Sequence, residues 1–217
     1  MNMALRPVKP VAPDFTPARV IRVYGMRRSG NHAVADWLQR NAPGGRAVFL
    51  NNCKPAAHPF KSFRGIEVNR TPGAARKAKA DLAAAAGQAG DGALLLISYE
   101  DCCPSDHSLD RPVSGGFAEE MLTGNILIIR SFLNWAASLL KKMQPNPSYT
   151  LSQRCGILLR SFAAYTRMLE LAGQAGDLDL AVVRYDDWVA DAANRGRTLA
   201  ALGLEVRDNT LGAVQRY

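Results

Sequence analysis

Short apolar runs alternate along the chain with segments whose apolar residues recur at helical spacing. The runs predict β-strands over residues 20–24, 47–50, 93–99, 125–130 and 178–184. Two of them, 93–99 and 125–130, are almost free of polar residues, which is typical of strands buried on both faces.

The intervening segments predict α-helices. They cover residues 33–39, 74–89, 132–143, 151–171, 187–202 and a short stretch from residue 209. The alternation favours a three-layer α/β sandwich with a central, mainly parallel sheet of about five strands. In such sheets, ligands bind beyond the carboxyl ends of the strands.

The remaining segments are irregular. Residues 1–18 contain four prolines and no apolar run, which predicts a disordered leader before one α/β domain over residues 19–217. Long loops are predicted over 51–72 and 101–118, and a short one over 144–150. No segment approaches the roughly 20 apolar residues of a membrane span.

Charge and cysteine usage narrow the function classes. Lys and Arg number 27 against 19 Asp and Glu, and the net charge of +8 favours an anionic partner such as a phosphate, nucleotide, nucleic acid or membrane surface. The four cysteines, at positions 53, 102, 103 and 155, form no C-x-x-C pair. They predict no disulfide framework and favour a cytoplasmic protein.

The loop that joins the first predicted strand to the first predicted helix has the glycine spacing of a phosphate-binding loop. Gly25 and Gly30 stand in a G-x-x-x-x-G pattern within residues 24–32. Small residues at this point let backbone N–H groups converge on a phosphate at a helix N-terminus. The sequence therefore predicts a P-loop-like turn.

The residues around this turn differ from those of nucleotide triphosphatases. Asn31 and His32 replace the Lys-Ser/Thr pair, so the hydroxyl that usually ligates Mg²⁺ is absent. The positive charges lie inside the loop instead, at Arg27 and Arg28. This pattern indicates a loop that binds an anion other than Mg-ATP or Mg-GTP.

A second anion-binding signal follows a later strand. Arg130 ends the run NILIIR, and Ser138 comes eight residues later in the next predicted helix. An arginine at a strand end can pair with a phosphate, and a helix hydroxyl can add a hydrogen bond.

Together these features resemble the sulfotransferases that use 3′-phosphoadenosine 5′-phosphosulfate (PAPS) and release 3′-phosphoadenosine 5′-phosphate (PAP). Residues 24–32 are similar to the family's Tyr-Pro-Lys-Ser-Gly-Thr-Thr loop, and Arg130 with Ser138 fits its 3′-phosphate element. The stretch VVRYDDW at 182–188 is similar to a strand followed by Tyr-Glu-Asp. The matches follow the family's order and span residues 20–188.

The resemblance implies a site with PAPS as donor and no metal. The donor-binding residues that it implies are Arg27, Arg28, Ser29, Gly30, Asn31, His32, Arg130, Ser138 and Tyr185. Arg28 would stabilise the leaving-group oxygen, and Glu100 falls where the family places a catalytic His or Glu beyond a central strand. His32, His58 and His107 are alternative bases.

The chain also departs from the family pattern. Gly25 and Met26 replace the Tyr-Pro entry, and Ala33 stands where cytosolic members have an aromatic residue that stacks on adenine. The late Arg-Lys-Gly element has no counterpart before Tyr217, so a short chain and a piece of a longer one are both open at this point.

The expected reaction transfers a sulfuryl group from PAPS to a hydroxyl or amine of a small molecule or carbohydrate. The polar loops over 51–72, 101–118 and 144–150 would face this acceptor and suit a sugar. We expect no nucleic-acid partner and no membrane span, while the sequence leaves the oligomeric state open.

Three alternatives remain at the sequence level. A P-loop kinase or another nucleotide phosphate-binding enzyme would share the glycine spacing, and a nucleic-acid-binding protein would share the basic charge. Cys53 with His58, and Cys102 and Cys103 with His107, have spacings that could assemble a zinc site.

Overall fold

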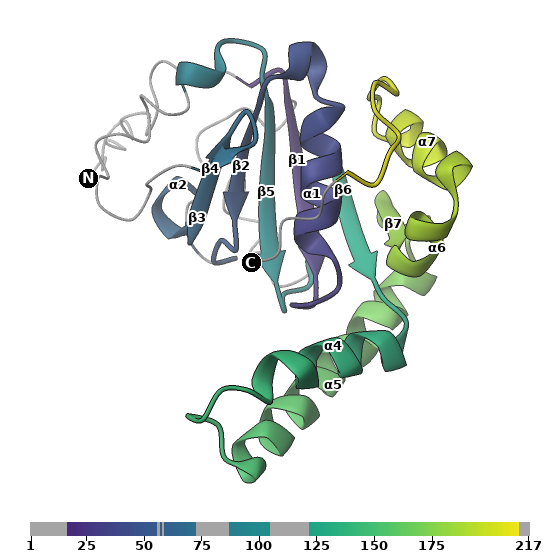
Figure 1. The fold of residues 1–217 in the computed structure, drawn as a ribbon. Helices are drawn as coiled ribbons and strands as arrows, with labels where there is room; N and C mark the ends of the chain where they lie inside the picture. Colours follow the sequence, from purple (N-terminus) through teal and green to yellow (C-terminus); the bar gives the residue numbers. More distant parts are fainter. Residues whose placement is uncertain (1–16, 56, 58, 73–86, 105–121, 213–217) are drawn as a thin grey trace, which may run out of the picture.

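A seven-stranded sheet organises the chain in the computed structural model, which describes residues 17–55, 57, 59–72, 87–104 and 122–212 (Figure 1). The strand order is β4-β3-β2-β5-β1-β6-β7. Its five parallel strands are those predicted from the apolar runs: β1 (Arg19–Gly25), β2 (Ala47–Asn51), β5 (Leu94–Glu100), β6 (Leu122–Ile129) and β7 (Leu180–Arg184). The predicted α/β class with a mainly parallel sheet is confirmed.

A hairpin at the sheet edge corrects the prediction of an irregular loop over residues 51–72. This segment contains α2 (Pro59–Ser62) and the antiparallel strands β3 (Gly65–Val68) and β4 (Thr71–Pro72). The two-residue turn between the strands is Asn69-Arg70, and both residues have positive φ, as a type I′ turn requires. Without a glycine in the turn, and with strands this short, the sequence carries no clear hairpin signal.

Helices cover both faces of the sheet. α1 (Asn31–Arg40), α6 (Tyr185–Ala190) and α7 (Ala192–Ala201) pack on one face, in a buried cluster that includes Trp37, Trp188 and Leu199. α4 (Phe132–Met143) and α5 (Leu151–Gly173) supply Trp135 and Met168 to the cluster on the other face. Figure 1 shows α4 and α5 near the arrowheads of β5 and β6, so these helices extend past the carboxyl edge of the sheet.

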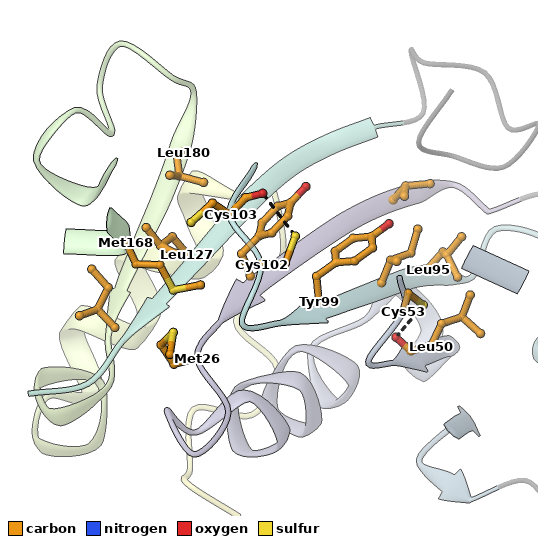
Figure 2. Packing of buried hydrophobic residues seen from close by; sticks show 14 of the residues in the cluster. Met26, Leu50, Cys53, Leu95, Tyr99, Cys102, Cys103, Leu127, Met168 and Leu180 are labelled. Atoms are coloured by element: carbon orange, nitrogen blue, oxygen red, sulfur yellow. Dashed lines mark hydrogen bonds between the residues drawn. The ribbon is translucent and has the colours of Figure 1, made fainter. Parts of the chain in front are cut away.

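Strand side chains alternate between the two clusters, as a strand buried on both faces requires. In β1, Val20 and Tyr24 join the cluster with α4 and α5, whereas Ile21 and Val23 join the cluster with α1. Figure 2 shows the first of these clusters, in which Tyr99 lies among apolar and sulfur-containing side chains.

Two helix predictions near the C-terminus are corrected. The predicted helix over 187–202 is two helices, because Asp191 has extended backbone angles and its side chain accepts a hydrogen bond from the Ala193 N–H. Residues 209–212 are not helical, although a helix was predicted from 209. There the Asp208 carboxylate accepts from the N–H and hydroxyl of Thr210, a local turn that competes with helix formation.

Some predicted segments lie outside the described residues. These are residues 1–16 of the predicted leader, residues 74–86 of the alanine-rich helix and residues 105–118 of the second loop. Within the part that the structure describes, no helix is long and apolar enough to cross a bilayer.

Candidate functional site

The loop between β1 and α1 lies at the carboxyl edge of the sheet, between the ends of two neighbouring strands. Gly25, the last residue of β1, is paired with Glu100 of β5 on one side and with Ile128 of β6 on the other. The strand order therefore brings the predicted phosphate-binding loop, the predicted base and the strand that leads to Arg130 to one place.

The loop backbone folds as a tight turn. The Met26 carbonyl accepts hydrogen bonds from the Ser29 N–H at 3.1 Å and from the Asn31 side-chain amide at 3.2 Å. Arg28 has φ 72°, a left-handed conformation that is costly for a residue with a side chain, and Gly30 has φ 100°. A Cβ at Gly30 would also overlap the ring of Tyr185, so this position requires glycine for two reasons.

Arg28 and Arg130 are brought together by contacts that cross the sheet edge. The Arg28 guanidinium donates from Nε to Ser138 Oγ at 3.2 Å, and Arg130 donates from Nη1 to the Arg28 carbonyl at 3.2 Å. The Arg130 guanidinium lies over the Tyr185 ring, 5.3 Å from its centre. The three segments that carry the sequence signals thus meet at one site.

Two residues that the sequence reasoning missed hold Arg130 and the start of α4. The Tyr165 hydroxyl donates to the Arg130 carbonyl at 2.7 Å. The Asp186 carboxylate accepts from the Ser131 N–H at 2.7 Å and from the Asn134 amide at 2.8 Å. Partial burial raises the pKa of Asp186, but the hydrogen bonds outweigh it, and the pKa lies below its usual value.

Arg27 has a different environment from Arg28. Its guanidinium forms an ion pair with Asp101, its N–H donates to the same carboxylate at 2.9 Å, and its carbonyl accepts from Trp135 Nε1 at 3.0 Å. Asp101 and Trp135 were also missed. The only local signals were that Asp101 follows Glu100 and that Trp135 lies five residues after Arg130, in the next predicted helix.

The predicted bases occupy separate positions. Glu100 is half-buried at the end of β5, and its Oε2 accepts from the Asn52 amide at 2.9 Å. The His32 ring packs edge-to-face on Phe49, 6.1 Å between centroids, on the α1 side of the sheet. His58 and His107 lie outside the described residues.

Several polar atoms of the site are buried without a protein partner among the described residues. They include Ser29 Oγ and Arg130 Nε, and the Ser29 side chain is only 1% exposed. Burying a polar group without a hydrogen bond is costly, so these atoms are suited to bind a polar ligand.

The cysteines near this edge are buried thiols. Burial raises the pKa of Cys53 to about 12, so its thiol stays protonated at neutral pH. Cys102 and Cys103 are also buried. Across the described residues, no three His, Cys, Asp or Glu side chains come together as a potential metal site.

Comparison with known proteins places this architecture in a structural class. No family model matches the chain, and no curated protein matches its sequence. The chain has a sulfotransferase-like α/β fold, because it superimposes on a solved sulfotransferase over most of its length. That structure is mouse sulfotransferase SULT7A1 complexed with PAP, with a TM-score of 0.53 and 14% sequence identity. The match covers 91% of this chain and 63% of the mouse chain.

Proposed function

We propose that the protein is a sulfotransferase that transfers a sulfuryl group from PAPS to a hydroxyl or amine acceptor. The observation that carries this proposal is the meeting of Arg28, Arg130 and Ser138 at a phosphate-binding loop without a Lys-Ser/Thr pair. These residues supply charged and hydroxyl donors for two phosphate groups. The sulfotransferase-like fold supports the same function.

The chain's own groups divide into two subsites in this proposal. Ser29, Gly30, Asn31 and His32 offer donors to the 5′-phosphate at the N-terminus of α1, where the helix dipole favours negative charge. The 3′-phosphate side is bound by Arg130, directly after β6, by Ser138 of α4 and by Tyr185 of α6.

Glu100 and Arg28 have complementary roles in the transfer step. Glu100 accepts the proton of the acceptor as the acceptor oxygen or nitrogen bonds to sulfur. The bond between sulfur and the 5′-phosphate oxygen breaks, and Arg28 stabilises the charge that develops on this leaving oxygen. The products are the sulfated acceptor and PAP, and the chemistry requires no metal.

The acceptor in this proposal is polar, with carbohydrate as the favoured class. Polar side chains surround the ends of β2 and β5 beside Glu100. The Asn52 N–H donates to Ser98 Oγ at 2.9 Å, and the Lys54 N–H donates to Ser62 Oγ at 3.1 Å. These bonds order the polar segment after β2, and its exposed Lys54 and half-buried Asn52 suit an acceptor that is rich in hydroxyl groups.

Calorimetry with purified protein tests the proposal directly. PAP without metal is titrated in one experiment, and ATP with Mg²⁺ in another. Binding of PAP with little response to Mg-ATP is the expected result. Strong binding of Mg-ATP without binding of PAP would replace the sulfotransferase proposal with a P-loop kinase or related enzyme.

A further inference from the structure

Asp101 binds the start of the phosphate-binding loop through three contacts. Its N–H donates to the Gly25 carbonyl at 3.0 Å. One carboxylate oxygen accepts from the Arg27 N–H at 2.9 Å, and the other forms the ion pair with the Arg27 guanidinium. A single side chain therefore holds both the backbone and the side chain of Arg27.

The backbone of Asp101 is itself unusual. β1 and β5 run in parallel to the pair Gly25 and Glu100, and the next residue, Asp101, has φ 54°. This left-handed turn directs its N–H back to β1, and aspartate tolerates the conformation better than most residues with a side chain. The end of β5 is shaped to meet the loop.

The loop carbonyls are bonded to protein donors in succession. Gly25 accepts from Asp101, Met26 from Ser29 and Asn31, Arg27 from Trp135, and Arg28 from Arg130. Carbonyl oxygens repel anions, whereas N–H groups attract them. With its carbonyls held by the protein, the loop can offer N–H groups to a phosphate.

The left-handed Arg28 is fixed from both sides in this arrangement. Strained residues of this kind persist only where their surroundings determine the conformation. Trp135 and Arg130 hold the carbonyls that flank Arg28, and Asp101 holds the preceding residue, Arg27. Releasing Arg27 would free one end of the strained turn.

We infer that Asp101 is a positioning residue of the donor site. By binding Arg27, it holds the loop in the conformation in which Arg28 and the loop N–H groups can bind phosphate. This inference rests on the proposed function, and it separates the roles of the two adjacent arginines. Arg27 shapes the loop, and Arg28 contacts the donor.

Positioning and simple electrostatics predict opposite results when the Asp101 charge is removed. A carboxylate beside a phosphate site repels the ligand, so electrostatics alone predicts that Asp101→Asn strengthens binding of PAP. Asparagine cannot form an ion pair with the Arg27 guanidinium, and its single amide oxygen cannot replace both carboxylate oxygens, which accept separately from the Arg27 N–H and guanidinium. Positioning predicts that Asp101→Asn weakens binding by about 10-fold, since a hydrogen bond to a charged group is lost.

The experiment combines PAP calorimetry with amide hydrogen exchange of the ligand-free protein. The variants are Asp101→Asn and Asp101→Glu, which keeps the charge but displaces it. The matched control is Asp208→Asn, because Asp208 likewise binds an arginine, Arg40, and a backbone N–H, that of Thr210. We expect about 10-fold weaker PAP binding in both Asp101 variants. We also expect faster amide exchange over residues 25–32 but not over 94–99. In the control, both PAP affinity and the exchange of residues 25–32 should match the wild type.

The outcomes distinguish this inference from the proposed function. Unchanged or tighter PAP binding in Asp101→Asn, with unchanged loop exchange, overturns the inference. If the wild type does not bind PAP, the proposed function fails, and exchange alone decides whether Asp101 fixes the loop. If the Asp101 variants do not fold, Arg27→Gln breaks the same ion pair, and faster loop exchange is again required.

Discussion

At the scale of single residues, the site depends on positions whose backbone adopts a left-handed conformation. Gly30 adopts positive φ directly beneath Tyr185, and Arg28 accepts a strained backbone. Glu100 lies at the strand end with Asn52 as a donor rather than with the arginines of the loop. The two carboxylates at the end of β5 therefore have different partners, which supports different roles for Glu100 and Asp101.

Gly30→Ala should destabilise the protein and weaken PAP binding. The left-handed conformation costs alanine roughly 1–2 kcal/mol, and displacement of the Tyr185 ring adds to this. Gly45→Ala is the matched control, because Gly45 also has positive φ but an added Cβ there would meet open space. Thermal unfolding should show a larger loss for Gly30→Ala than for Gly45→Ala. Equal losses would mean that the contact with Tyr185 is unimportant.

Glu100→Gln should lower turnover by about 10²–10⁴-fold, the usual contribution of a general base. The substitution keeps the shape of the side chain and removes its basicity, so PAP affinity should change by no more than a few-fold. The rate of sulfuryl transfer at saturating acceptor measures this effect. The control is Glu205→Gln, because the Glu205 side chain is exposed and lies outside the candidate site. Near-normal turnover would mean that Glu100 has a structural role, and His32 would be the next candidate base to test.

At the scale of elements, the junction between β6 and α4 joins the candidate site to the core. Arg130 follows the last residue of β6, and α4 begins two residues later. Tyr165 from α5 and Asp186 from α6 bind the backbone on either side of the Arg130–Ser131 peptide bond. Two helices, α5 and α6, thus fix the backbone at Arg130, and the Tyr185 ring of α6 lies under its guanidinium.

Arg130→Ala should weaken PAP much more than adenosine 5′-phosphosulfate, which lacks the 3′-phosphate. Loss of a charge-assisted hydrogen bond costs about 1.5–3 kcal/mol, equivalent to about 10- to 150-fold in affinity. Arg28→Ala should weaken both ligands and slow transfer. Calorimetry with the two nucleotides makes the comparison, and similar losses for both in Arg130→Ala would contradict its assignment to the 3′-phosphate.

The turns that aspartates stabilise should lose stability in acid. Hydrogen bonds from Thr210 and Arg40 hold the pKa of Asp208 well below its usual value, and the pKa of Asp186 is also lowered. Because the folded state binds these protons less tightly than the unfolded chain, their stabilisation is complete above about pH 4 and declines as pH falls through the lower folded pKa. Urea unfolding between about pH 5 and about pH 2 covers this range. Over it, the free energy of unfolding should decline less for Asp208→Asn than for the wild type. An identical decline would exclude a role for Asp208.

At the scale of the whole molecule, the sheet separates two cores and gathers the site at one edge. α1 and α6 approach this edge from one face, and α4 approaches it from the other. A ligand that contacts the loop, Arg130 and Tyr185 would therefore connect helices of both layers. Its binding should stabilise the fold as a unit.

PAP should raise the melting temperature without added metal. At 100 times its dissociation constant, a ligand that binds only the folded state adds about 2.7 kcal/mol of stability. For a chain of this size, this corresponds to a rise of roughly 5–10 °C. Differential scanning fluorimetry in the presence of a chelator measures the shift. A rise that requires Mg²⁺ would contradict metal-free binding.

The sequence by itself determined the five parallel strands and the residue types of the loop after β1. Continuous apolar runs specify buried parallel strands, and the G-x-x-x-x-G spacing predicts a phosphate-binding turn, because both signals reside in neighbouring residues. The β3–β4 hairpin was not predictable, since its Asn69-Arg70 turn lacks glycine. The sequence alone also shows that Asn31 and His32 stand where nucleotide triphosphatases have Lys and Ser/Thr.

Only the tertiary structure decided the partner of each arginine. Arg27 pairs with Asp101, 74 positions away, and Arg28 contacts Ser138, 110 positions away. These contacts exist because β1 lies between β5 and β6, so that the ends of three strands meet at one edge. Strand order depends on packing across the whole sheet, and periodicity within one segment carries no information about it. Two adjacent arginines that are equivalent in the sequence therefore have different environments in the fold.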